Sequence, residues 1–250
     1  MVVPGLPAVR VRGWSAWAPG LSAREDWLAF LRAPHALGSA GMPEVKFIAP
    51  MQARRMSRLN RMALCAGHAC CADAGVPEDS VRLVMASRHG DLSVMVRLLK
   101  ALAEKETVLP ADFTNSVHHT AVGFWGIAVK DREPSRAVAG GEASFCYGFL
   151  DAAGLLVREP GRPVLLVMAD DTVPPPFDSI AGGPGTPHSV ALLLESGAGP
   201  GSCRLVLDEG GAAPDGGLGL PALDFLRWHA LGAAGDLAVS SGGRLWRWTR

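Results

Sequence analysis

The chain has 250 residues, 24 basic residues balanced by 24 acidic ones, and 48% hydrophobic side chains. That apolar fraction excludes a disordered chain, because disorder requires low hydrophobicity together with high net charge. Zero net charge argues against a general nucleic-acid binder, which needs an excess of Lys and Arg. No apolar run approaches the roughly 20 residues that span a bilayer. Prolines and arginines within residues 1–14 argue against a signal peptide, and five irregularly spaced cysteines suit a reducing compartment. We expect a globular cytoplasmic protein.

Glycine and proline divide the chain into segments whose apolar spacing predicts helices and buried strands. In chain order we expect a helix over 54–74, a strand over 81–87, a helix over 92–104, a strand over 136–139, a helix over 142–157, and strands over 164–169, 189–195 and 204–208. Strands without polar alternation, separated by amphipathic helices, predict an α/β fold with helices layered over both faces of a mixed sheet. We assign no secondary structure to residues 1–50. Residues 196–221 are interpreted as a loop or linker, and they precede a tryptophan-rich tail.

Few residues carry obvious chemistry. Cys65, Cys70 and Cys71 lie near His68, but their spacing is not that of a zinc site and no second cysteine pair follows. We therefore expect no metal and no cofactor, and we interpret these cysteines as core. The adjacent His118 and His119 are better candidates for function, although neighbouring side chains cannot share one helix face.

Several segments, in order, resemble the β-ketoacyl synthases. Residues 54–76 (RRMSRLNRMALCAGHACCADAGV) are similar to an early helix of that family, and 81–90 to a strand that crosses its dimer interface. Residues 110–128 (PADFTNSVHHTAVGFWGIA) resemble a Phe-x-Asn-Ser-Val-His pattern, 133–144 the segment that carries the nucleophile, and 176–195 the end of the N-terminal half. The resemblance implies a thiolase-like layered fold, mainly its N-terminal half: residues 1–195 would form a synthase N-terminal-like domain, and 196–250 a Gly/Pro-rich linker with a short, truncated C-terminal remnant.

The resemblance places Glu142 at the position of the family's nucleophilic cysteine. Condensing enzymes need a thiolate at a helix N-terminus, where the helix dipole and backbone amides lower the thiol pKa. The thiolate accepts the acyl chain covalently, and a carboxylate is a much poorer acyl acceptor. The alternative is a stand-alone minimal synthase or acyltransferase that uses Cys146 with His118 or His119, although Cys146 lies on the apolar face of its predicted helix.

The sequence also lacks histidines that the resembled enzymes use, which again argues against condensing activity. In the resembled enzymes the two histidines that assist condensation come from a second thiolase-like half, whereas only His229 follows residue 190 here. The resemblance therefore implies a non-catalytic chain-length factor of the short, aryl-polyene type, paired with a Cys-bearing ketosynthase in type II polyketide assembly. The family dimerises through the strand that corresponds to 81–87 and the region before the nucleophile. A stand-alone acyl- or ligand-binding module is a further possibility.

The resemblance also suggests where such a subunit would act. The candidates for the interface and the wall of the partner's acyl tunnel are Phe113, Asn115, His118, His119, Phe124 and Trp125. Ordinary core packing is an equally good interpretation of Phe124 and Trp125. A basic stripe at helical spacing could dock an acidic acyl carrier protein, although such a row is more often a solvated helix face; it consists of Arg54, Arg55, Arg58 and Arg61.

Overall fold

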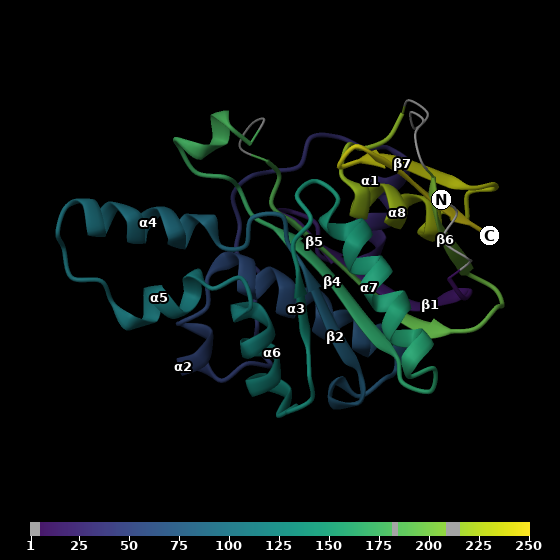
Figure 1. Cartoon of the computed structure of the whole chain (residues 1–250), viewed down its shortest axis with the longest axis horizontal. Helices are drawn as coiled ribbons and strands as arrows, with labels where there is room; N and C mark the ends of the chain where they lie inside the picture. Colours follow the sequence, from purple (N-terminus) through teal and green to yellow (C-terminus); the bar gives the residue numbers. More distant parts are fainter. Residues whose placement is uncertain (1–5, 182–184, 209–215) are drawn as a thin grey trace.

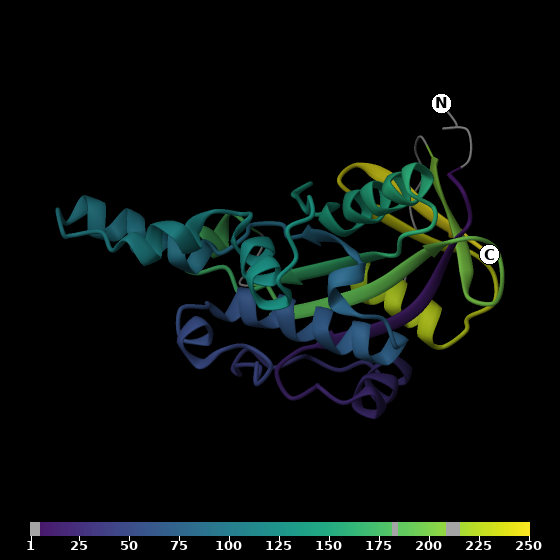
Figure 2. The ribbon, with the colours of Figure 1, turned by 90° about the horizontal axis from the view of Figure 1, so that it is seen from below.

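The computed structural model describes residues 6–181, 185–208 and 216–250. In these residues one sheet has the strand order β3-β2-β4-β5-β1-β6-β8-β7, with helices on both of its faces (Figure 1, Figure 2). The strands are β1 (Val9–Trp17), β2 (Arg82–Ala86), β3 (Arg136–Val138), β4 (Val164–Asp170), β5 (His188–Ser196), β6 (Ser202–Asp208), β7 (Leu237–Ser241) and β8 (Arg244–Thr249). The helices are α1 (Arg24–Arg32), α2 (Pro50–Ala53), α3 (Arg58–Ala74), α4 (Leu92–Ala103), α5 (Pro110–Ser116), α6 (Thr120–Val129), α7 (Ser144–Arg158) and α8 (Pro221–Ala230), with short 3-10 turns at η1 (Glu78–Ser80) and η2 (Phe177–Ser179).

The central strands confirm the predicted mixed sheet. β2 runs parallel to both β3 and β4, whereas β5 is antiparallel to β4 and to β1. Each of the five strands predicted from apolar runs is present, as β2 to β6. Strands β4 and β5 are buried along most of their length because helices cover both of their faces.

The two faces of the sheet build two separate cores. Successive strand residues point to opposite faces, so Leu165 packs under α3 and α6 while Leu166 packs under α7. The α3 side is lined by apolar residues of that helix such as Met62, and the α7 side by residues such as Phe149. This alternation confirms the α/β fold with layered helices.

The first long helix begins later than its apolar spacing predicts. Ser57 is the N-cap of α3, since its Oγ accepts the Asn60 amide at 3.3 Å, and Gly75 in the left-handed conformation ends the helix. The predicted start at residue 54 is therefore wrong. Arg54 and Arg55 lie in the turn between α2 and α3, outside the helix.

Residues 1–50, left unassigned from the sequence, supply a central strand. In β1, Val9 and Val11 are buried, while Arg10 and Arg12 face outward and form ion pairs with Glu195 of β5. A register shift between residues 11 and 13 interrupts this alternation. That bulge explains why the period-two pattern is hard to recognise in the sequence.

The C-terminal segment joins the same sheet and core. Strand β6 pairs with β1 and β8, and β7 forms a hairpin with β8. Trp248 of β8 and Phe225 of α8 pack on Phe145 and Phe149 of α7, with ring centroids 5.3 to 6.0 Å apart. The boundary predicted at residue 195 thus falls at the end of β5, inside one continuous sheet, and residues 209–215 of the predicted linker lie outside the described residues.

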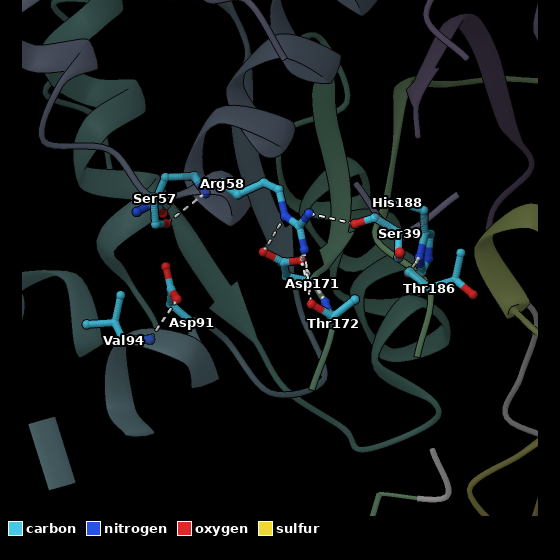
Figure 3. Close-up of polar contacts among 10 residues, drawn as sticks. Ser39, Ser57, Arg58, Asp91, Val94, Asp171, Thr172, Thr186 and His188 are labelled. Atoms are coloured by element: carbon cyan, nitrogen blue, oxygen red, sulfur yellow. Dashed lines mark hydrogen bonds and ion pairs between the residues drawn. The ribbon is translucent and has the colours of Figure 1, made fainter. Parts of the chain in front are cut away.

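Arg58 joins three separate segments at one end of α3 (Figure 3). Its guanidinium binds both carboxylate oxygens of Asp171, with the Nε–Oδ2 distance 3.0 Å, and it donates to Thr172 Oγ1 at 3.0 Å and to the Ser39 carbonyl at 2.8 Å. Only 20% of the Arg58 side chain and 12% of the Asp171 side chain are exposed. Removing one partner would therefore leave a largely buried charge without compensation.

We expect Arg58→Met to lower the free energy of unfolding by about 3 kcal/mol, because it leaves Asp171 without its counter-ion. Urea denaturation followed by circular dichroism measures this loss. The control, Arg54→Met, removes the same charge from an exposed side chain and should stay within about 0.5 kcal/mol of the native protein. Equal stability of the two variants would contradict the structural role of Arg58.

Candidate functional site

Glu142 lies in a tight turn that joins β3 to the buried helix α7. Gly141 adopts φ +60°, and Ser144 Oγ closes the turn by accepting the Gly140 amide at 3.0 Å and donating to the Gly141 carbonyl at 2.7 Å. A side chain at residue 140 would collide with the ring of Tyr147. The turn therefore holds residue 142 immediately before the N-terminus of α7, the place that the sequence resemblance gives to the nucleophile.

The side chain of Glu142 faces open space at this turn. It is 65% exposed, and its carboxylate lies 3.5 Å from the Arg88 guanidinium. Both residues line a cavity of about 900 Å³. Because the N-terminus of a helix favours negative charge, a carboxylate is electrostatically suited to this position. It offers no thiol, so the site cannot form the thioester that condensing enzymes use.

Cys146, the alternative nucleophile, is fully buried in the core beneath α7. Burial raises the pKa of its thiol to about 12, so the thiol is protonated at neutral pH and is a poor nucleophile. His119 precedes α6, whose core residues pack on the opposite face of the sheet from Cys146.

We expect Cys146 to resist iodoacetamide in the native protein and to react once the chain is unfolded. A pKa of about 12 lowers the thiolate fraction roughly a thousandfold relative to an ordinary cysteine, and burial blocks access as well. Peptide mass spectrometry after timed labelling measures the rates. Half-buried Cys65 is the internal control and should react before Cys146. Rapid native labelling of Cys146 would restore the alternative.

The six residues predicted to form an interface and tunnel wall differ widely in exposure. Trp125 is 1% exposed and packs in the core near Gly67 and Leu165, so the core interpretation accounts for its burial, and a place in a tunnel wall stays a prediction. Phe124 is half-buried and lies against the same core. Phe113, in contrast, is 65% exposed.

The remaining candidates lie where the segment 92–119 leaves the body. Asn115 is buried and donates from Nδ2 to the Arg55 carbonyl at 2.9 Å. His118 Nε2 lies 3.1 Å from the Ser87 carbonyl at the end of β2, whereas the neighbouring His119 is exposed. Asn115 and His118 therefore anchor the segment to the body, and His119 faces away from it.

Helices α4 and α5 form an arm that extends from the body of the protein (Figure 1, Figure 2). Large apolar side chains on this arm are exposed: Met95, Leu99, Leu102, Leu109, Phe113 and Val117. Met95, Leu99 and Leu102 are spaced so that they lie on one face of α4. The helix predicted over 92–104 is present as α4, and of these three residues and the neighbouring Leu98 only Leu98 is buried. The sequence signal for this exposed face is that the apolar residues of α4 cover more of the helix surface than a single packing contact can bury.

The four arginines do not form one stripe. Arg58 is held by Asp171, and Arg61 donates to the Ala53 carbonyl at 2.6 Å. Arg54 and Arg55 precede α3 and are exposed. The helical spacing of the four residues is therefore not realised, because Ser57 starts the helix after two of them.

Two polar residues that the sequence analysis missed also line the cavity beside Glu142. Asp170 ends β4, and His188 begins β5 directly opposite it. The sequence feature that could have identified Asp170 is a carboxylate directly after a run of apolar strand residues. Across residues 6–181, 185–208 and 216–250, no three His, Cys, Asp or Glu side chains are grouped so that they could hold a metal ion. Over the same ranges, no helix has the length and apolar character to cross a membrane.

The sheet order, the two helical layers and the turn before α7 define a ketosynthase-like protein of the thiolase fold. One chain in the structure of the ketosynthase ApeO in complex with its chain length factor ApeC, from Xenorhabdus doucetiae, is 30% identical with a TM-score of 0.81, and the alignment covers 97% of this chain and 99% of that chain. Residues 27–249 match the family model for the beta-ketoacyl synthase N-terminal domain. The chain therefore belongs to the beta-ketoacyl synthase family.

More distant structures share the fold over part of their length. The ishigamide ketosynthase/chain length factor is 20% identical with a TM-score of 0.63, and a beta-ketoacyl synthase from Burkholderia phymatum STM815 is 14% identical with a TM-score of 0.64. Each alignment covers 76% of this chain, but only 62% and 59% of those chains, respectively. The search of curated proteins found no significant match.

Proposed function

We propose that this chain is a non-catalytic chain-length factor that pairs with a Cys-bearing ketosynthase and shapes its acyl tunnel during elongation on an acyl carrier protein. The observation that carries the proposal is Glu142 in the turn that heads α7, where acyl transfer needs a thiolate. The nearest thiol along the helix, Cys146, is buried and protonated at neutral pH.

The comparison with the ApeO–ApeC complex supports a paired arrangement. That structure contains a ketosynthase and its chain length factor. The alignment with one of its chains covers nearly the whole length of that chain and of this one. Active synthases of this fold supply a thiolate and two histidines, which this chain does not combine. Pairing would supply those groups from the partner.

Two surfaces are suited to such a partner. The first is the apolar arm of α4 and α5, since exposed apolar patches of this kind commonly mark protein interfaces. The second is β3, whose outer edge is unpaired among the described strands. Strand β2 (82–86) has β3 and β4 on its two sides, so the strand predicted to cross the dimer interface is internal. We therefore propose that β3, the region before Glu142, carries the sheet edge of the interface.

Phe113 is the residue best placed to enter the partner's tunnel. It is 65% exposed on the arm, and the arm is held to the body at its base by Asn115 and His118. A rigidly held aromatic ring can exclude longer chains, because packed interiors resist even one extra methylene. We propose that Arg54 and Arg55, which remain exposed, are the residues available for docking an acidic carrier protein.

Reconstitution tests the function directly. We expect a Cys-bearing ketosynthase, this chain and an acyl carrier protein together to produce elongated chains, and this chain with the carrier protein alone to produce none. Size-exclusion chromatography should show the chain and the ketosynthase in one complex. Condensation by this chain alone would make it a stand-alone synthase and overturn the proposal, as would elongation that is identical with and without the chain.

A further inference from the structure

Helix α7 leaves one of its faces uncovered. Of its 15 residues, nine are buried in the core. The other six follow the helical spacing i, i+3, i+4, i+7, i+10 and i+11, so they lie on one face of the helix. We call this face the outer stripe of α7; it consists of Tyr147, Leu150, Asp151, Gly154, Val157 and Arg158. No described helix or strand crosses over α7 in Figure 1, so a mainly apolar stripe of a central helix faces outward.

Gly154 is the one position of the outer stripe without a side chain. Glycine weakens a helix interior relative to alanine, because it loses more backbone entropy on folding. A Cβ at Gly154 would meet no atom within 4 Å, whereas a Cβ at Gly148 of the same helix would lie 3.0 Å from side-chain atoms of Ala86 and Leu166. Packing within this chain therefore requires glycine at 148 and not at 154. A close contact from outside the chain accounts for the glycine at 154.

A groove of about 1020 Å³ runs between the outer stripe and strand β3. Tyr147, Leu150 and Gly154 line its α7 side, and residues 136–140 line its β3 side. Among the described residues that line the groove, the charged ones are Arg136 and Asp151, which form an ion pair with each other. Because this pair is already formed within the chain, an apolar occupant would leave no charge in the groove without a partner. The groove therefore suits an apolar occupant.

The groove is continuous with the sheet edge proposed above for pairing. Strand β3 is the outermost described strand on its side of the sheet, and its three residues are half-buried. A partner that adds a strand to β3 brings the helices that cover its own sheet next to α7, because such helices form a layer over the same face. A helix of that layer meets the outer stripe at Gly154, where two helix axes can approach closely since no side chain separates them.

We propose that the outer stripe of α7 docks an apolar helix of the ketosynthase partner, and that the two helices cross at Gly154. This inference rests on the proposed pairing, and it adds a helix–helix contact to the surfaces on the arm and on β3. Tyr147 forms a fixed wall of the groove, because its ring packs edge-on against Trp246 with the ring centroids 4.9 Å apart. Gly154 makes the contact selective, since the partner helix must present a side chain that fills the space above it.

Substitution of Gly154 separates docking from folding. In the full chain alone, Gly154→Ala should raise the melting temperature by about 2–4 °C, because alanine favours the helix and its methyl group meets no atom. In isothermal titration against the Cys-bearing ketosynthase, Gly154→Leu should weaken binding at least about tenfold, because the larger side chain holds the two helices apart. Gly154→Ala should weaken binding about threefold and carries the test if Gly154→Leu does not fold. Stability and affinity then change in opposite directions, which a role within the chain alone would not produce.

Gly123 of α6 is the matched control, since it is also a helical glycine at which a Cβ would meet no atom within 4 Å. Gly123→Ala should raise the melting temperature by a similar amount, and Gly123→Leu should leave the affinity for the ketosynthase within about twofold. Binding of Gly154→Leu as tight as that of the native chain would overturn this inference and leave the proposed pairing in place, whereas no binding by the native chain would overturn both. A dimer of the native chain that Gly154→Leu dissociates would assign the outer stripe to a second copy and would also overturn it.

Discussion

Replacing Trp248 with alanine should lower the free energy of unfolding by about 4 kcal/mol. Trp248 is fully buried in β8 and packs on Phe145 and Phe149 of α7 and on Phe225 of α8. Truncation removes the apolar contacts of the indole and leaves a cavity that the surrounding rings can fill only in part. The effect should be large because this contact joins the C-terminal strands to the central helix.

Urea denaturation, followed by circular dichroism and by fluorescence, measures this loss. Phe113→Ala is the matched control: it also truncates an aromatic side chain, but one that is 65% exposed, so it should change stability by no more than about 0.5 kcal/mol. A Trp248 variant as stable as the native chain would show that residues 196–250 do not contribute to the core.

Phe113→Ala should instead change the product. In the reconstituted ketosynthase complex we expect chains longer than the native product to rise about tenfold or more relative to the native length, since excluding one methylene from a pocket corresponds to about 1–3 kcal/mol. The reason is that the exposed ring on the arm would no longer close the end of the partner's tunnel. Mass spectrometry of the carrier-bound chains measures the distribution.

Trp125→Ala is the control that distinguishes a role of Phe113 in the tunnel wall from a general disruption of the arm and its neighbours. Trp125 is 1% exposed in the core between α6, α3 and β4, so we expect a loss of about 3–5 kcal/mol in stability without a longer product. An unchanged product distribution with Phe113→Ala, or longer products only with Trp125→Ala, would remove Phe113 from the tunnel wall.

The strands and helices with simple periodicity could be predicted from the sequence. Continuous apolar runs predicted the strands now seen as β2, β4 and β5, because strands covered on both faces leave no polar alternation. Strand β1 was missed, since a bulge between Val11 and Gly13 interrupts the alternation of its buried valines with Arg10 and Arg12. The start of α3 was placed four residues early, because apolar spacing continues past the N-cap at Ser57.

The candidate site could be predicted only in part. Glu142 was found because its segment resembles a known one, and the structure places it at the head of α7. Other residues that line the same cavity, Arg88, Asp170 and His188, come from the ends of three different strands. Local spacing has no information about which strand ends meet, so these residues could not be grouped in advance.

By itself, the sequence determined the α/β class, the identity of the residue before the central helix and the absence of a thiol there, because these depend on residue type and local periodicity. Tertiary structure alone decided which apolar side chains are core and which are surface. Trp125, Trp248 and Phe113 are equally apolar, yet only the first two are covered by neighbouring elements. The physical reason is that burial depends on which segments pack together over long separations in the chain, and a periodic pattern specifies a face of a helix or strand without specifying what lies against it.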